Sequence, residues 1–235
     1  RFALPRKLHD EGIERFGFHG LSYQFIAESL PALSAAGAEG RVVVAHLGSG
    51  ASMCAMHRGR SVATTMGMTA LDGLMMGTRC GALDPGVLLY LLQQRGLPAD
   101  AVSDMLYRQS GLLGVSSISS DLRVLENSAA PQAEEAQALF AYRARQSLAS
   151  LVAAVGGLDV LVFTGGIGTH SANMRARICD GLGWLGVELD QARNAAGGAA
   201  LHTQTSRVEI HAVATDEEIV IARACSATLA GSAVS

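Results

Sequence analysis

The sequence is poor in charged residues, aromatic residues and proline. Charged residues make up 17%, aromatic residues 5%, and only 5 prolines occur in 235 residues. No segment approaches the ~18 consecutive apolar residues of a membrane-spanning helix, and the first residues do not show the charged-then-apolar pattern expected of a signal peptide. The 18 Lys and Arg residues are scattered and the net charge is −3, so no basic patch is present. We therefore expect neither a membrane nor a nucleic acid among the partners.

The sequence also lacks paired cysteines. Its four cysteines, Cys54, Cys80, Cys179 and Cys225, lie far apart, and none belongs to a CxxC pair. This spacing argues against a zinc site and against a disulfide framework. The pattern is typical of reduced thiols in a cytoplasmic protein.

What the sequence has in abundance is apolar residues, at 49%, and glycine, at 27 residues. The first number indicates a folded chain with a sizeable core. Many glycines are clustered rather than spread evenly. Such clusters are typical of backbone that turns sharply or approaches a ligand closely.

The hydrophobic pattern predicts alternating strands and helices, and hence the α/β class. The first three strands form a predicted β-meander. Thr215 and the carboxylates after it are expected to cap the closing helix. The predicted strands are 41–46, 51–57, 60–65, 160–163 and 208–213, and the predicted helices are 85–95, 98–109, 132–155, one beginning near Ser171, and about 216–229.

Two glycine-rich segments follow predicted strands. In residues 46–52, HLGSGAS, the Gly-x-Gly would let backbone N–H groups line an anion, although a plain hairpin turn is the better explanation of this segment taken alone. In residues 164–171, TGGIGTHS, a buried strand leads into three glycines and a helix, a geometry that suits nucleotide phosphates or adenine. This second segment is not a Walker A loop. A tight strand-to-helix turn is the alternative there.

Three further positions are candidates for chemistry. Asp121 and Arg123 could contact ribose and phosphate, or could simply pair with each other. Arg79 lies among glycines and apolar residues, where a guanidinium needs an anionic partner, either a protein carboxylate or a substrate phosphoryl group. His19, between Phe18 and Gly20, is either structural or directed at a reacting centre.

Taken in order, six motifs closely resemble the acetate kinase family, which includes propionate and butyrate kinases. The match runs through almost the whole chain but covers only about the C-terminal three-fifths of a family member. The motifs are RFGFHG (15–20), HLGSGAS (46–52), LDGLMMGTRCG (71–81) followed by Asp84-Pro85, SGLLGVSSISSDLR (110–123), FTGGIG (163–168) and TDEEIVIAR (215–223).

The resemblance implies an actin-like α/β domain of the sugar kinase, Hsp70 and actin superfamily, with a mixed sheet flanked by helices. Residues 1–235 would be the C-terminal nucleotide-binding and dimerisation domain of a cytoplasmic homodimer, and the closing helix would pack toward the N-terminal domain. The implied reaction moves the γ-phosphoryl group of ATP to acetate or another short-chain carboxylate. It yields an acyl phosphate and ADP and uses Mg²⁺.

Carried over by motif, the resemblance assigns roles to individual residues. His19 and Arg79 would act on the transferring phosphoryl group, a step that depends on positioning and electrostatics. Glu217 would be a ligand of Mg²⁺. The nucleotide would be bound by His46, Leu47, Gly48, Ser49 and Gly50, by Asp121, Leu122 and Arg123, and by Gly166, Ile167, Gly168, Thr169 and His170.

The chain departs from the usual family pattern at several positions. Thr169-His170 replaces Glu-Asn, and Asp216 replaces an Asn before the metal-side Glu217. In the acyl pocket Ala70 replaces Pro and Met68 replaces Phe. The smaller wall at Ala70 would admit one more methylene, which is worth only ~1–3 kcal/mol of discrimination. Propionate is therefore expected to be a better substrate than in stricter family members.

The resemblance also implies a missing part. In the family a catalytic Asp, a carboxylate-binding Arg and a metal-side Asn all precede the matched segment, and this sequence opens on Arg1 rather than Met. We expect residues 1–235 alone to bind nucleotide weakly and to turn over little or nothing. The alternative is a nucleotide-binding and dimerisation module without catalysis.

Overall fold

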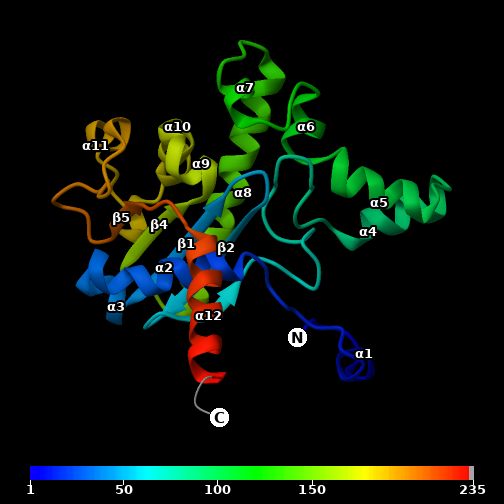
Figure 1. Ribbon diagram of the computed structural model, residues 1–235. Coiled ribbons are helices and arrows are strands. Elements are labelled where there is room, and N and C mark those ends of the chain that lie inside the picture. The colour runs from blue at the N-terminus through cyan, green and yellow to red at the C-terminus, as the bar shows by residue number, and fades with distance from the viewer. Residues whose placement is uncertain (233–235) are drawn as a thin grey trace.

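The computed structural model describes residues 1–232, with side chains through residue 229, and is built on one five-stranded sheet (Figure 1). The strand order is β3-β2-β1-β4-β5. β1 pairs antiparallel with β2 and parallel with β4, while β2–β3 is antiparallel and β4–β5 is parallel. The predicted meander and mixed sheet are therefore confirmed. The strands are β1 (Arg41–Leu47), β2 (Ala51–His57), β3 (Arg60–Thr64), β4 (Val160–Thr164) and β5 (Glu209–Ala212).

Both faces of the sheet are covered by helices, which explains why β1 and β4 are apolar almost throughout. Alternate residues point to opposite faces. Val43 and Ala45 face a core that contains α8 (Pro131–Val155), whereas Val42 and Val44 face a second core that contains α2 (Gly20–Leu33). The expected sheet flanked by helices is confirmed.

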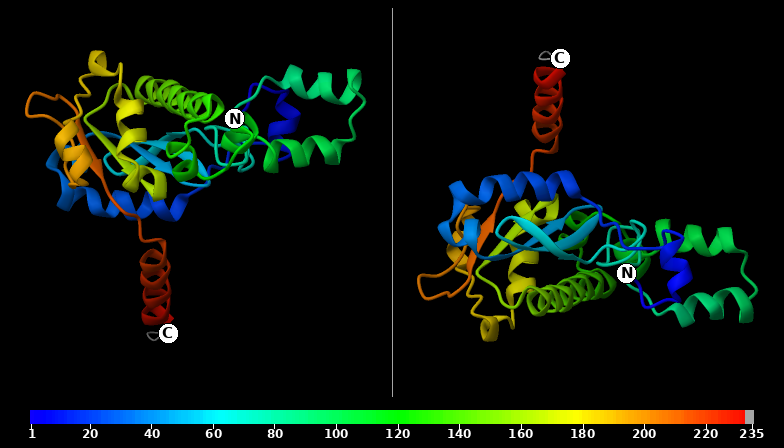
Figure 2. Two further views of the ribbon diagram at one scale, coloured as in Figure 1. Left: turned by 90° about the horizontal axis from the view of Figure 1, so that it is seen from above. Right: turned by 90° about the horizontal axis from the view of Figure 1, so that it is seen from below.

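The helices differ in how they relate to the sheet (Figure 2). α2 and α3 cover one face, and α8 with α10 covers the other. The remaining helices connect or project. The helix bounds not yet given are α1 (Arg6–Asp10), α3 (Ala35–Glu39), α4 (Pro85–Leu89), η1 (Tyr90–Gln94), α5 (Ala99–Arg108), α6 (Gly111–Ser116), α7 (Leu122–Glu126), α9 (Gly165–His170), α10 (Ala172–Cys179), η2 (Gly183–Leu185), α11 (Gln191–Ala196) and α12 (Glu217–Ser232).

The helix ends follow their local chemistry. α8 begins with Pro131 at its first turn and ends where Gly156 takes a φ of 80°. α4 begins after Asp84, whose carboxylate accepts from Gly86 N, and carries Pro85 in its first turn. The predicted helix 85–95 is present, but its second half, η1, is π-helical.

The closing helix α12 projects from the body of the molecule (Figures 1 and 2). Its N-terminus is capped by Asp216, whose Oδ1 accepts from Ile219 N at 2.9 Å. The Thr215 hydroxyl is buried and has no hydrogen-bond partner within the described residues. The expected capping by a carboxylate is therefore confirmed for Asp216, whereas the expected capping by the Thr215 side chain is wrong.

Two further expectations need correction. α2 was not predicted, because Pro31 lies near its C-terminal end and its apolar residues do not follow a clear helical period. The glycine segment after β4 is not a loop, since α9 begins at Gly165 itself. Ser171 caps α10, the helix predicted to begin near that residue. No helix within residues 1–232 is long and apolar enough to cross a membrane.

Candidate functional site

The site is centred on the turn between β1 and β2. Gly48 N donates to Gly50 O at 2.9 Å, so residues 48–50 form a hairpin turn. A side chain at Gly50 would crowd two candidate catalytic residues, because a Cβ there would lie 2.9 Å from Arg79 Nη2 and 3.2 Å from His19 Nε2. The glycine turn is thus both a hairpin and the surface on which two candidate catalytic side chains converge.

Neighbouring segments meet at the same turn. Gly77 N donates to Ser49 O at 3.1 Å, and a Cβ on Gly48 would lie 3.9 Å from Gly166 N. β1 and β4 are parallel, so their carboxyl ends bring these segments to one edge of the sheet. That edge is where ligands bind in open α/β sheets.

His19 is held in an unusual backbone conformation. It precedes α2 in the left-handed region, with a φ of 59°. Its Nδ1 lies 2.8 Å from Ser52 Oγ, and its ring stacks on that of His46 with centroids 4.1 Å apart and planes at 13°. His46 Nδ1 in turn lies 2.8 Å from Ser22 Oγ. The ring of His19 is therefore fixed in both position and plane.

Both stacked histidines are neutral near pH 7. Burial is the main cause, and it lowers the pKa of His46 as well as that of His19. His46 and Arg79 lower the pKa of His19 further, to about 4, although the nearby Glu217 carboxylate acts in the opposite sense. A neutral imidazole in this position donates a hydrogen bond without adding charge.

Arg79 has no carboxylate partner within the described residues. Its Nη1 donates to Ala70 O at 2.7 Å, which leaves Nη2 on the side of Gly50. Of the two partners considered from the sequence, the protein carboxylate is therefore absent from the described part of the chain. The guanidinium is available to an anionic ligand.

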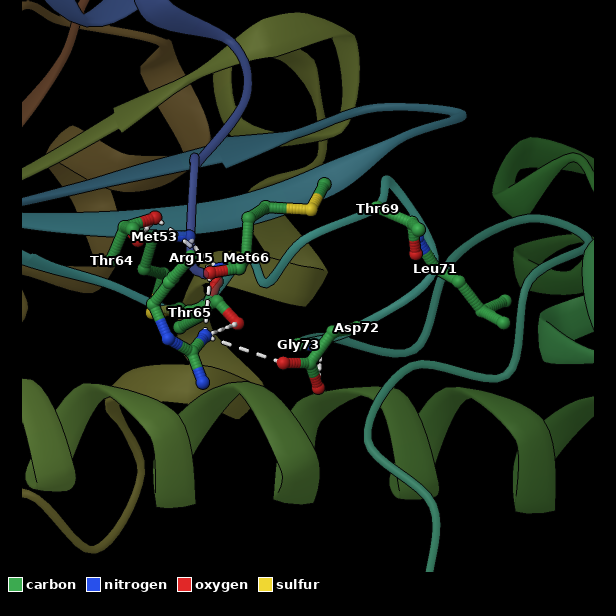
Figure 3. Close-up of polar contacts among 9 residues, drawn as sticks. All are labelled: Arg15, Met53, Thr64, Thr65, Met66, Thr69, Leu71, Asp72 and Gly73. Carbon is green, nitrogen blue, oxygen red and sulfur yellow. Dashed lines mark hydrogen bonds and ion pairs between the residues drawn. The ribbon is translucent and has the colours of Figure 1, made fainter. Parts of the chain in front are cut away.

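The loop that carries Ala70 and Arg79 is anchored from two sides. Arg15 donates to Met66 O at 2.5 Å and pairs with Asp72 at 3.3 Å, as Figure 3 shows. From the other side α6 donates to the loop, with Leu112 N bound to Met76 O at 2.9 Å. This places the RFGFHG and LDGLMMGTRCG segments in one rigid unit.

Asp121 and Arg123 occupy the N-terminus of α7, beside the site. Asp121 caps the helix by accepting from Arg123 N at 2.9 Å, and the two side chains pair at 2.6 Å. Leu122 is buried in the core. The local ion pair is the arrangement present.

The residues of α9 differ in their access to a ligand. Gly166 and His170 are exposed, Ile167 and Thr169 are partly buried, and Gly168 is buried against β1 and β4. The Thr169 hydroxyl donates to Gly165 O at 2.7 Å within the helix. Nothing lies within 4 Å of a Cβ built on Gly166, so its backbone is the open face of this segment.

Glu217 is the first residue of α12 and lies near His19, since its charge affects the pKa of that ring. No cluster of three or more His, Cys, Asp or Glu side chains that could hold a metal occurs in the described part of the chain. A single carboxylate is nevertheless compatible with Mg²⁺, which usually keeps several waters and binds substrate phosphates.

Two residues of the site had no role in the sequence-based prediction. Tyr23 bonds to Ser52, and Ser52 bonds to His19. Their proximity depends on the hairpin register that pairs Ser52 with His46, and on α2, which was not predicted. A helix assigned to residues 20–33 would have put Tyr23 one turn after His19.

Comparison with known proteins gives consistent matches. The model of the Acetokinase family matches residues 1–223. An acetate kinase of Rhodopseudomonas palustris (strain TIE-1) is 58% identical over 225 residues, which cover 94% of this chain and 56% of that protein. The chain thus spans about half the length of the curated relatives it matches.

Solved structures are similar over the same region. The crystal structure of Porphyromonas gingivalis acetate kinase has a TM-score of 0.92 and 36% identity, covering 97% of this chain and 59% of that one. A propionate kinase from Francisella tularensis has a TM-score of 0.88 and 35% identity, covering 95% and 58%.

Proposed function

Because the chain belongs to the acetokinase family, we propose that it forms the phosphoryl-binding and nucleotide-binding part of an ATP:carboxylate phosphotransferase. In the proposed reaction a carboxylate oxygen of acetate attacks the γ-phosphorus of ATP. The bond from that phosphorus to the β–γ bridging oxygen breaks, giving acetyl phosphate and ADP. The observation that carries this proposal is the convergence of His19 and Arg79 at Gly50.

The two side chains suit the charge of the transferring group. Phosphoryl transfer needs fixed donors around the equatorial oxygens more than it needs covalent chemistry. Arg79 supplies a cation held in place by Ala70 O, and neutral His19 supplies a donor held by stacking and by Ser52. Neither has to reorganise during the reaction.

Mg²⁺ is proposed to lie on the Glu217 side of this pair. Bound there, the ion would neutralise charge on the nucleotide phosphates. Glu217 fits because its carboxylate is close to His19 and takes no part in an ion pair of the described residues. Asp216 is occupied as the helix cap of α12, so Glu217 is the residue we assign to the metal.

The nucleotide is proposed to lie along the turn and the two flanking segments. His46 to Gly50 would contact its phosphates, and residues 121–123 and 166–170 its adenosine end. The Asp121–Arg123 pair is exposed and therefore contributes little to stability, so contacts with a ribose could replace it at little cost. The open backbone at Gly166 supports a close approach there.

The acyl acceptor is proposed to include propionate as well as acetate. The backbone carbonyl of Ala70 accepts from Arg79, so this small residue lies beside the proposed phosphoryl-binding guanidinium. Replacing it with the larger residue typical of the family, Ala70→Pro, should raise the preference for acetate over propionate by about 10-fold in kcat/KM. An unchanged ratio would contradict this assignment.

We further propose that the protein is a cytoplasmic homodimer. Each subunit would contain an N-terminal domain in addition to the residues described here. The four cysteines are free thiols, as in a reducing compartment. α4 and η1 contain no buried residue, and they expose Leu89 and Tyr90 as a candidate contact between subunits. We also propose that residues 1–235 alone turn over little.

The direct test is the effect of Arg79→Lys on acyl-phosphate formation from ATP and acetate in the complete protein. Because lysine lacks the planar guanidinium of Arg79 with its several N–H donors, kcat should fall about 100-fold. Arg108→Lys, at an exposed position, is the control and should leave kcat unchanged. An unaltered kcat in Arg79→Lys would refute the proposed site. A protein that binds nucleotide but forms no acyl phosphate would instead be a non-catalytic module.

A further inference from the structure

Behind His19 lies a short chain of hydrogen-bonding side chains that the proposed reaction does not itself use. Tyr23 follows His19 by one helical turn on α2, and its hydroxyl makes a short hydrogen bond with Ser52 Oγ. Ser52 Oγ lies 2.8 Å from His19 Nδ1. The order of groups is therefore Tyr23, Ser52, His19.

This chain is shielded from water. Tyr23 is 7% exposed and Ser52 is fully buried. Within the described residues, the Ser52 hydroxyl has Tyr23 and His19 as its side-chain partners. Its single hydrogen can go to only one of them, so it must accept a hydrogen bond from the other.

The chemistry of the two hydroxyls sets the direction. A phenol is a stronger donor than an alkyl hydroxyl, and burial raises the pKa of Tyr23 so that its proton stays in place. Tyr23 therefore donates to Ser52, and Ser52 donates to His19 Nδ1. With Nδ1 acting as the acceptor, a neutral ring carries its proton on Nε2.

Nε2 is the nitrogen that faces the site, 3.2 Å from a Cβ built on Gly50 and next to the Arg79 guanidinium. Building on the function proposed above, we propose that Tyr23 and Ser52 are positioning residues. They hold His19 in the Nε2-protonated tautomer, with its N–H directed at the transferring phosphoryl group. The opposite tautomer would present a lone pair to an anionic oxygen.

The stacked ring of His46 completes the arrangement. Stacking at 13° fixes the plane of the His19 ring, whereas Ser52 fixes which nitrogen is protonated. Ser22 bonds to His46 rather than to His19, so it has no part in the choice of tautomer. Among the side chains bonded to the two stacked rings, Tyr23 and Ser52 are therefore the ones that act on Nδ1 of His19.

The test is the tautomer of His19, read from long-range ¹H–¹⁵N correlations of the full chain labelled at histidine. The His19 signals are identified by their loss in His19→Gln. The wild-type spectrum should show the Nε2–H form. Ser52→Ala should lose that single form, and Ser52→Thr, which keeps a hydroxyl, should restore it. Tyr23→Phe should give a mixture of tautomers.

A matched control is Ser29→Ala, which removes a hydroxyl from α2, the helix that carries Tyr23. Within the described residues that hydroxyl donates to Phe25 O and takes no part in the Tyr23–Ser52–His19 chain. It should leave the His19 spectrum unchanged. An Nδ1–H form in the wild type, or a spectrum of Ser52→Ala identical to the wild type, would overturn the proposal. Because neither nucleotide nor acid is present, this result does not depend on the proposed reaction.

Kinetics of the complete protein distinguish the positioning of His19 by Tyr23 and Ser52 from the use of His19 in catalysis. Ser52→Ala should lower kcat about 10-fold while the KM for ATP stays nearly constant, because a directed donor is lost and no nucleotide contact is removed. The Nε2–H form together with an unchanged kcat would refute the catalytic use of His19 and leave the positioning itself intact.

Discussion

His19 is the candidate catalytic residue whose position and charge are both set by its surroundings. Its left-handed backbone and its stacking on His46 place the ring, and its environment removes the charge. Burial is the largest contribution to a pKa of about 4, with His46 and Arg79 adding to it. A donor of this kind complements the neighbouring Arg79 without repelling it.

The lowered pKa of His19 predicts how stability depends on pH. Well above pH 6.5 the ring is neutral in both the folded and unfolded states, so it contributes no pH dependence there. As the pH falls from 6.5 toward 4, the unfolded state takes up a proton that the folded state refuses, and stability falls. In His19→Gln this loss should be smaller, as measured by urea unfolding at pH 7, 5.5 and 4.5. Parallel curves for the two proteins would contradict the assigned pKa.

Arg175 is the other residue with an unusual environment. The residue is 1% exposed, and its guanidinium donates to the side chain and carbonyl of Asn194 and to the carbonyls of Gly168 and Thr169. No carboxylate pairs with it in the described part of the chain. A buried cation is thus held by neutral acceptors, two of which belong to the candidate nucleotide segment.

Replacing Arg175 should therefore be costly. A lysine offers one nitrogen and cannot reach all four acceptors, so Arg175→Lys should destabilise the protein by about 2–4 kcal/mol. The exposed Arg108→Lys should stay within about 0.5 kcal/mol. Equal unfolding midpoints for the two variants in urea would show that the buried guanidinium of Arg175 is not needed for stability.

At the scale of elements, the glycine segment after β4 combines a structural and a ligand-facing glycine in adjacent positions. Gly165 has a φ of 75°, and a Cβ on it would lie 2.6 Å from Leu47 O. Gly166 has open space around the same position. Substitution of each to alanine therefore separates folding from binding.

Gly165→Ala should lower stability by about 1–3 kcal/mol, because the residue would be strained and in collision with β1. Gly166→Ala should keep the wild-type stability but weaken nucleotide binding, since the methyl group fills the space left for the ligand. Thermal unfolding and a nucleotide titration measure the two effects. A stable Gly165→Ala, or a Gly166→Ala with wild-type affinity, would contradict this division.

How far the elements could be predicted depended on the strength of their local signals. The β1–β2 hairpin and α8 were readable because two apolar runs of 7 residues end at or near a glycine, Gly48 and Gly59, and because α8 is bounded by Pro131 and Gly156. α2 and α9 were missed, since Pro31 and three glycines are poor helix formers that tertiary packing overrides. The motif segments were identified, but the Tyr23–Ser52 contact depends on packing that no local pattern encodes.

At the scale of the whole molecule, two projections leave the body of the sheet and its helices (Figure 2). The arm of α4, η1 and α5 exposes apolar side chains, and so does α12, which contacts the body mainly through α2. Such surfaces are typical of segments that another chain or domain covers. They support the proposed dimer and the proposed packing of α12 toward a further domain.

The arm leads to a prediction about assembly. Leu89 is 53% exposed, and Leu89→Glu should shift the protein from dimer to monomer, because a charge would be buried in the proposed interface. Trp184→Glu, at a 69% exposed position outside the arm, should leave the mass unchanged. Light scattering after gel filtration measures both. A Leu89→Glu protein that remains dimeric would exclude the arm as the interface.

The central claim is that this chain supplies the phosphoryl-binding half of an acetate-kinase-type site and needs a further domain for turnover. The most direct measurement is acyl-phosphate formation from ATP, Mg²⁺ and acetate, trapped as hydroxamate, by residues 1–235 alone and joined to the N-terminal region of an acetate kinase. We predict product only from the joined protein, and its loss in Arg79→Lys. Comparable turnover by residues 1–235 alone would contradict the account.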